Sequence, residues 1–187
     1  INPYTSGNAG GGIYIALNAL SGSGKFIDIL IDNPVDNGSG HGIGLYPCHN
    51  LDGNIFMNNA VSVNAKHRGF FADSYTSTAP LVNINKLIII TYSTPLTFAR
   101  WEGRANNGRL GNIHIGEVEI KNNIKSYSHV ALIDVHNEPA ENLVIGKLRT
   151  KGEATRSIYS NTIKPMQIDD YTGETIMTHD FTVNRFD

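Results

Sequence analysis

The feature that most constrains the fold is a six-residue pattern that returns at nearly regular intervals. Each copy reads apolar, any residue, apolar, then Asn, Gly or Asp, any residue, apolar. The copies are Ile29–Pro34 (degenerate), Ile55–Ala60, Val82–Leu87, Ile113–Val118, Leu143–Leu148 and Phe181–Phe186. Their Asn, Gly or Asp anchors are Asp32, Asn58, Asn85, Gly116, Gly146 and Asn184, at spacings of 26, 27, 31, 30 and 38 residues. A period of this size predicts structural units that stack on one another.

The chemistry of the pattern favours a strand, a sharp bend and a second strand. Two apolar residues separated by one point to the same face of a strand, and Asn, Asp and Gly tolerate the left-handed backbone of a one-residue bend. About a dozen residues later, each unit shows a further apolar strand; these lie at Gly42–Leu45, Gly69–Ala72, Leu96–Phe98, Val130–Ile133 and Ile158–Tyr159. Each unit is therefore expected to run strand, bend, strand, variable loop, strand, loop.

Such a unit cannot bury its own apolar face, so successive units must stack. We therefore predict an all-β fold, a right-handed parallel β-helix with rungs of about 26–31 residues, as a single domain over residues 1–187 with an irregular insertion over 151–180. A β-sandwich or jelly roll is the alternative, since Ile15–Leu20 also fits the pattern only 14 residues before Asp32. The Leu-x-x-Leu-x-Leu frame of leucine-rich repeats is absent.

Composition narrows the class of protein. The chain carries 15 Lys and Arg against 17 Asp and Glu, which does not provide the basic surface that nucleic-acid binding needs. The longest purely apolar run, Leu87–Ile90, is far too short to span a bilayer, so no membrane insertion is expected. A single cysteine, Cys48, excludes an internal disulfide framework. Because the sequence starts at Ile1 without Met, we expect a piece of a longer polypeptide.

Three local motifs are interpreted as structural. Ser21–Lys25 resembles the end of a phosphate-binding loop but lacks the Ser or Thr that holds magnesium, so a flexible turn is expected. The alternating glycines of Gly38–Gly44 do not form the dinucleotide fingerprint and are expected in a tight loop. His41, Cys48 and His49 lie close in sequence, but three ligands without a fourth do not predict a metal site. No metal and no other cofactor is expected.

The rung length, the Asn and Gly bends and the 17% of charged residues resemble the pectate-lyase-type β-helices, and especially the tailspike proteins of bacteriophages, over residues 13–186. The resemblance concerns architecture, and no diagnostic catalytic motif is present. It implies a homotrimeric, virion-borne, extracellular protein that binds, and often cleaves, a bacterial surface polysaccharide such as capsule or O-antigen.

Carbohydrate cleavage requires carboxyl groups on one surface, and stacked rungs provide suitable spacings. Glycosidases hold two carboxyl groups about 5–5.5 Å or about 6.5–9.5 Å apart, and neighbouring rungs lie about 5 Å apart. The second strands of three successive units end near Asp73, Glu102 and Asp134, which are the candidate catalytic residues. If Phe70 and Ala72 face inward, Asp73 faces outward, and Asp134 is expected above or below it in the same sheet.

The candidate substrate-binding residues combine hydrogen-bonding or cationic groups with aromatic rings that can stack on sugars: Arg100, Trp101, His136, Tyr75, His67 and Arg68. A polysaccharide lyase is a second enzymatic route, because Arg100 and His136 offer a base and charge stabilisation for proton removal next to a uronate. The residues leave open the choice between hydrolase and lyase. They also leave open a non-catalytic glycan receptor-binding module and a rigid structural spike module.

Overall fold

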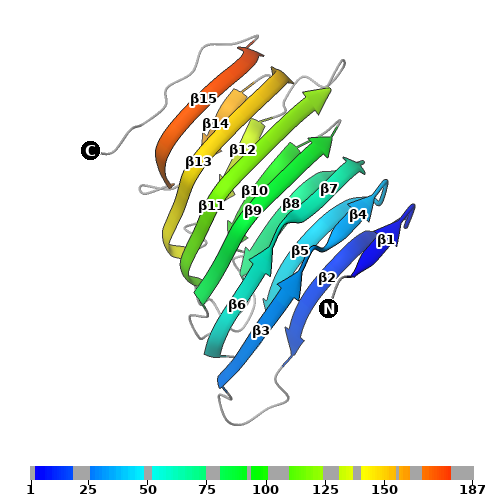
Figure 1. Cartoon of the computed structure of the whole chain (residues 1–187), viewed down its shortest axis with the longest axis vertical. Coiled ribbons are helices and arrows are strands. Elements are labelled where there is room, and N and C mark those ends of the chain that lie inside the picture. The colour runs from blue at the N-terminus through cyan, green and yellow to red at the C-terminus, as the bar shows by residue number, and fades with distance from the viewer. Residues whose placement is uncertain are drawn as a thin grey trace.

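The chain forms a parallel β-solenoid of about 4 turns in the computed structural model (Figure 1). The structure describes residues 3–18, 26–48, 52–74, 81–91, 94–100, 110–123, 131–136, 140–154, 156–160 and 166–177. Every element in these ranges is a β-strand, and every strand pairing is parallel. The β-helix predicted from the repeat is therefore confirmed as a parallel β-solenoid. Among these residues, no helix is long and apolar enough to cross a membrane.

Nine strands form the larger sheet. It contains β1 (Tyr4–Ser6), β3 (Phe26–Asp32), β4 (Val35–Asn37), β6 (Asp52–Asn58), β7 (Ala60–Ala65), β9 (Leu81–Thr91), β11 (Leu110–Asn123), β13 (Ala140–Ala154) and β15 (Gln167–Met177). The main path runs β1-β4-β7-β9-β11-β13-β15, while β3 pairs with β6 and β6 pairs with β9. In the first rungs the bend thus separates two strands, whereas from β9 onward one long strand covers both.

Six strands form the smaller sheet, which carries the second apolar strand of each unit. They are β2 (Gly11–Asn18), β5 (His41–Cys48), β8 (Arg68–Ser74), β10 (Thr94–Arg100), β12 (Ala131–His136) and β14 (Arg156–Ser160), paired in the order β14-β12-β10-β8-β5-β2. The pattern-like segment at Ile15–Leu20 begins within β2. That copy therefore belongs to the other sheet, which explains its wrong spacing.

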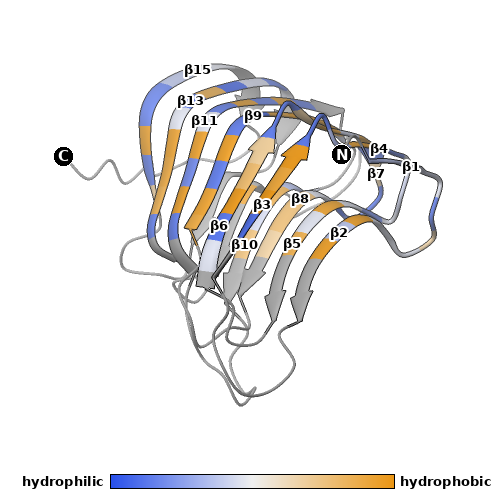
Figure 2. Ribbon diagram, turned by 60° about the horizontal axis from the view of Figure 1, so that its bottom comes forward, coloured by the Kyte–Doolittle hydropathy of each residue, from blue (hydrophilic) through white to orange (hydrophobic). Residues whose placement is uncertain are grey.

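The core lies between the two sheets and is built from stacked apolar residues. Ile55, Val82 and Ile113 occupy equivalent positions in successive rungs, and all three are buried. Figure 2 shows the alternation of apolar and polar residues along β9, β11 and β13. Because apolar area removed from water stabilises by about 25 cal/mol per Å², this periodic burial holds the rungs together.

The sharp bends lie one residue later than the sequence anchors. Asn33 and Asn59 have φ of 46° and 45°, a left-handed conformation that Asn tolerates better than most residues. At the corresponding bend of the later described rungs no residue has positive φ, although Gly152, further along β13, has φ of 111°. Gly116 and Gly146 therefore do not provide a left-handed bend. A Cβ at Gly146 would lie 2.8 Å from the carbonyl oxygen of Gly116. Glycine is needed there for the close approach of neighbouring backbones.

Asparagine and aspartate side chains form a ladder along the bend. Asn58 Nδ2 donates to Asp32 Oδ1 at 2.7 Å, and Asn85 Nδ2 donates to Asn58 Oδ1 at 3.2 Å. Asn59 Nδ2 likewise donates to Asn33 Oδ1 at 3.1 Å. The repeated Asn and Asp residues therefore link successive rungs on the outside of the solenoid.

The last described rung differs from the sequence expectation. Register places Asp169 beside Gly146, 23 residues later in the sequence. The span 151–180, expected as an irregular insertion, contains β14 and β15, which continue both sheets. The predicted copy Phe181–Phe186 lies outside the described residues. In this rung Tyr171 takes the inward position of Leu148 and bonds the Thr150 hydroxyl at 3.2 Å.

Gly42 and Gly44 lie within β5, and only the earlier part of the Gly38–Gly44 run forms the expected tight turn. Gly38, with φ of 80°, lies in that turn. A Cβ at Gly42 would lie 2.1 Å from Ser62 Oγ. The glycine therefore gives room for a buried side chain of the opposite sheet.

Candidate functional site

The most distinctive described surface lies on the outside of the six-stranded sheet, where β2, β5 and β8 begin. Five side chains meet there: Tyr14, His41, His67, Arg68 and Phe71, named here the His–Arg cluster. The turns that precede these strands stack in register, because the His67 amide donates to the Gly40 carbonyl at 2.7 Å and the His41 amide donates to the Gly10 carbonyl at 2.8 Å. This stacking places residues from three rungs side by side.

Two aromatic rings form the floor and one wall of the cluster. Tyr14 packs edge-on against Phe71, with ring centroids 5.4 Å apart and an interplanar angle of 76°. Gly44 lies between them in register, and a Cβ there would be 2.1 Å from Phe71 Cζ. Phe71 is only 4% exposed, whereas Tyr14 is 48% exposed. Tyr14 therefore presents aromatic surface to solvent while Phe71 supports it.

Histidine 41 occupies the centre of the cluster. Its ring lies 5.1 Å from the ring of His67 and 5.8 Å from that of Phe71, measured between centroids. Burial lowers the pKa of His41 below its ordinary value of 6.5, and the positive charges of Arg68 and His67 lower this pKa further. Its Nδ1 atom is buried and has no hydrogen-bond partner. A neutral imidazole with an unused nitrogen therefore lies among polar and cationic neighbours.

Arginine 68 completes the cluster on the next rung. Strand register pairs Arg68 with His41, and the guanidinium carbon lies 5.4 Å from the centroid of Phe71. A cation over an aromatic face gains about 0.5–1 kcal/mol or more when partly desolvated. Because Arg68 is partly buried and His67 is exposed, the cluster offers hydrogen-bonding groups beside an apolar ring. Sugars need that combination, since they carry hydroxyls and flat apolar faces.

The structure aligns the predicted catalytic strands differently from the expectation. Asp73 pairs in register with Ala99, and Ala99 pairs with His136. Asp134 pairs with Thr97, which pairs with Phe71. Asp134 therefore lies in the Phe71 row, two residues along the strand from the Asp73 row. With rungs about 4.8 Å apart and about 3.3 Å per residue, the Cα atoms of the two aspartates are about 12 Å apart.

The other predicted site residues divide into two groups. Tyr75, Trp101 and Glu102 lie outside the described residues. For Asp73, Arg100, Asp134 and His136, the structure describes the backbone in β8, β10 and β12.

Arg68 is the first residue of β8 and His67 directly precedes it, whereas Asp73 lies near the end of the strand. Five residues of strand between Arg68 and Asp73 correspond to about 17 Å. The structure therefore does not bring this pair next to the predicted catalytic aspartate.

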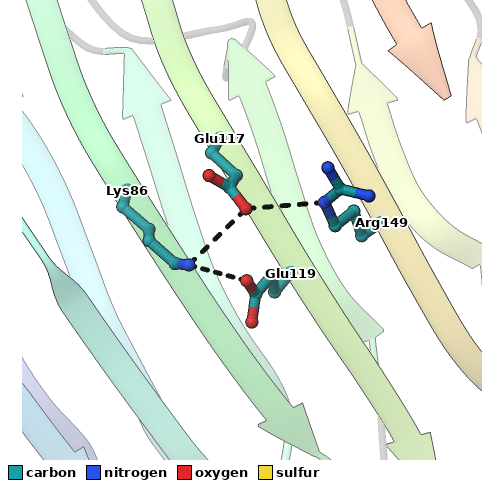
Figure 3. A network of polar contacts seen from close by, with 4 residues as sticks. All are labelled: Lys86, Glu117, Glu119 and Arg149. Carbon is teal, nitrogen blue, oxygen red and sulfur yellow. Dashed lines mark hydrogen bonds and ion pairs between the residues drawn. The ribbon is translucent and has the colours of Figure 1, made fainter. Parts of the chain in front are cut away.

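A second polar feature lies on the nine-stranded sheet and has a structural role (Figure 3). Lys86 Nζ lies 2.6 Å from Glu119 Oε1 and 3.5 Å from Glu117 Oε1, and Arg149 Nε lies 3.6 Å from Glu117 Oε1. The hydrogen bond with Glu119 raises the pKa of Lys86, and the same contact lowers the pKa of Glu119. Opposite charges on neighbouring strands favour the observed register, and their mutual pairing leaves this surface less suited to a ligand.

No group of three His, Cys, Asp or Glu side chains is positioned to hold a metal ion in the described ranges. No protein-family model, curated protein or solved structure matches the chain.

Sequence reasoning missed Tyr14 and Phe71 as parts of a site and considered His41 only as a metal ligand. A signal for the aromatic pair was present. Aligning Gly42–Leu45 with Gly69–Ala72 already places Gly44 beside Phe71, and a glycine next to a large ring indicates space that another ring can enter.

Proposed function

We propose that this chain binds a bacterial surface polysaccharide on the outer face of the six-stranded sheet, across β2, β5 and β8. The observation that carries the proposal is the half-exposed Tyr14 ring, supported by the buried Phe71 and placed beside His41 and Arg68. A rigid aromatic ring provides a stacking surface at low entropic cost, and the neighbouring nitrogen groups can bond hydroxyls. The resemblance to bacteriophage tailspikes supports bacterial capsule and O-antigen as the ligands to test.

The extent of the site suits a chain-like ligand. The Tyr14 ring reaches back over Gly11, because a Cβ there would lie 1.9 Å from Tyr14 Cζ. Gly11, His41 and Arg68 are paired in register across three strands. The row therefore spans two rung spacings, about 10 Å, and crosses the strands along the solenoid axis. An extended oligosaccharide can lie along such a row and contact each rung in turn.

The binding test uses calorimetry with oligosaccharides prepared from a panel of capsules and O-antigens. We expect saturable binding that Tyr14→Ala weakens about tenfold, equivalent to about 1.4 kcal/mol. Tyr4→Ala is the matched control, since Tyr4 is an exposed tyrosine on the nine-stranded sheet. Equal loss in both variants, or no binding to any glycan, would contradict the proposal and favour a structural spike module.

We propose depolymerisation as the accompanying activity, with Asp73, Glu102 and Asp134 as the catalytic carboxylates. The register that brings β8, β10 and β12 together supports a shared surface, with Asp73 and His136 in one row. Mass spectrometry of glycan products tests it: unsaturated ends indicate a lyase, and products with added water indicate a hydrolase. Unchanged cleavage by Asp73→Asn, Glu102→Gln and Asp134→Asn would reject these residues.

The homotrimer and the virion location belong to the same proposal and rest on the tailspike resemblance. Sedimentation equilibrium of the purified chain tests the trimer, and a mass corresponding to a monomer across the concentration range would count against it. Antibody labelling of virions tests the location.

A further inference from the structure

We infer that the His–Arg cluster binds an oxyanion carried by the polysaccharide, so that the ligand is an acidic glycan bearing carboxylate or phosphate groups. The inference rests on the proposed function and specifies the ligand class. It comes from the convergence of His41, His67 and Arg68 beside a solvent-facing aromatic ring.

The geometry gathers nitrogen groups from two neighbouring rungs. The His41 and His67 rings are 5.1 Å apart, and Arg68 is paired with His41 in register. Neighbouring rungs lie about 4.8 Å apart, so one small anion can contact more than one of these groups. Arginine has planar N–H groups in a fixed fork that matches the oxygens of a carboxylate or phosphate.

The electrostatics favour an anion over a cation. The guanidinium of Arg68, which helps to lower the pKa of His41, carries a permanent positive charge. A bound metal ion would add to this positive charge, whereas an oxyanion would offset it. An anion bound beside Arg68 would also favour the protonated form of His41, which can then donate a further hydrogen bond to it.

The buried Nδ1 atom of His41 supplies a second, independent observation. Buried polar atoms in folded proteins nearly always have a hydrogen-bond partner, and an exception calls for a physical explanation. Nδ1 of His41 has none. When protonated, this nitrogen can donate to an anionic oxygen. The ligand then satisfies an atom that the protein leaves unpaired.

The aromatic residues make the site selective for an anionic sugar rather than a free anion. Within the cluster, Phe71 is buried, and Tyr14 has about half of its surface exposed. An inorganic anion would use only the nitrogen groups. An acidic sugar places its ring against Tyr14 while its anionic group meets Arg68, so both contacts contribute to one binding event.

The experiment compares matched ligands by calorimetry with the full chain. The probes are oligoglucuronate, its carboxyl-reduced neutral counterpart, a phosphate-bearing oligosaccharide and inorganic phosphate. We expect at least tenfold tighter binding of an acidic oligosaccharide than of the neutral counterpart, and weak binding of inorganic phosphate. The two acidic probes distinguish carboxylate from phosphate as the source of the anion.

Variants separate the contacts. Arg68→Gln is expected to weaken acidic-glycan binding about tenfold and neutral-glycan binding by a clearly smaller factor, because the neutral sugar loses only a hydroxyl contact. Arg68→Lys should be intermediate, because it keeps the charge and loses the fork. Arg149→Gln on the nine-stranded sheet is the matched control and is expected to leave the affinities for the acidic and the neutral glycan unchanged. Circular dichroism confirms that each variant is folded.

The outcomes are distinguishable. Equal affinity for the acidic and neutral glycans, with both weakened by Tyr14→Ala, overturns the anion inference and leaves the proposed function standing. Binding of inorganic phosphate as tight as that of the acidic glycans overturns the sugar selectivity. No binding to any probe or any member of the glycan panel overturns both proposals.

Discussion

Tyr14 packs against Phe71 across an intervening strand, with ring centroids 5.4 Å apart and Gly44 of β5 between them. The contact joins residues from the first and third strands of the six-stranded sheet. It exists because the middle position has no side chain to separate the two rings. One glycine thus creates the aromatic surface on which the proposed glycan site depends.

Substitution at Gly44 tests this relationship. Gly44→Val places methyl groups where the Phe71 ring now lies, since a Cβ alone would be 2.1 Å from Cζ. We expect destabilisation of about 1–3 kcal/mol, as for other overpacked sites, measured by urea unfolding. Gly10→Ala is the control, because nothing lies within 4 Å of a Cβ at that position. A Gly44→Val chain as stable as the original would mean that Phe71 moves away freely.

Because Asn59 lies in the left-handed bend and Asn85 does not, substitution of these two exposed asparagines should destabilise the protein to different extents. Asn59 has φ of 45°, and Asn85 is not among the positive-φ residues. Asn59→Val should lower the free energy of unfolding by about 1–2 kcal/mol more than Asn85→Val, because a β-branched residue is disfavoured in this conformation. Asn59→Gly should retain most of the stability. Similar losses for both valine variants, measured by urea unfolding, would contradict the assignment of strain to the bend.

One buried and one exposed phenylalanine test which face of each sheet packs in the core. Phe98 is fully buried and its ring lies 6.3 Å from that of Phe70, whereas Phe56 is 40% exposed. Phe98→Ala should destabilise by about 3–5 kcal/mol, and Phe56→Ala by well under half of that. Thermal and urea unfolding provide the measurement. Equal effects would mean that the inward and outward faces of the sheets are misassigned.

The pKa of His41 predicts how stability depends on pH. Burial and cationic neighbours lower this pKa in the folded protein below 6.5, so the unfolded chain binds protons more readily. The contribution of His41 is fully present above about pH 6.5 and is lost as the pH falls through its folded pKa. The free energy of unfolding of the His41→Gln chain should therefore fall less between pH 7 and pH 5 than that of the unsubstituted chain. Urea unfolding at a series of pH values gives this comparison. The same dependence of the free energy of unfolding on pH for both chains would refute the prediction.

The ion pairs of Lys86, Glu117, Glu119 and Arg149 on the nine-stranded sheet should contribute little to the stability of the fold. Lys86 and Glu119 are 2.6 Å apart but remain partly exposed, and pairs of this kind contribute little to stability because water and salt screen them. Lys86→Met is expected to leave the midpoint of urea unfolding nearly unchanged, with any difference shrinking at high salt. A large loss of stability that does not depend on salt would indicate that these ion pairs are needed to keep neighbouring rungs in register.

The strand stacking could be predicted from the sequence because it depends on spacing and alternation. The four copies from Ile55–Ala60 to Leu143–Leu148 all lie in register in one sheet. The sequence analysis missed one rung, since Met166–Tyr171 fits the same pattern and the structure places Asp169 beside Gly146. The predicted copy Phe181–Phe186 lies outside the described residues and stays a prediction. Two candidate copies close in sequence cannot be ranked by pattern, because loop lengths between rungs vary.

The candidate site was only partly predictable for a related reason. Asp134 was expected above or below Asp73, and register places it two residues away, in the row of Phe71. A shift by two residues preserves which side chains face the core. Alternation in the sequence therefore cannot detect it. His67 and Arg68 were recognised as candidates, but their partners Tyr14 and His41 come from earlier rungs.

By itself, the sequence determined the repeating unit, the all-β solenoid and the inward positions, because these follow from residue spacing and from the need to bury apolar faces. Only the tertiary structure decided which outward-facing residues of neighbouring rungs lie beside one another. That choice depends on how each loop positions one rung on the next, on close backbone approaches such as Gly116 to Gly146, and on ring packing across Gly44. These are contacts between distant residues, and the His–Arg cluster exists only where they meet.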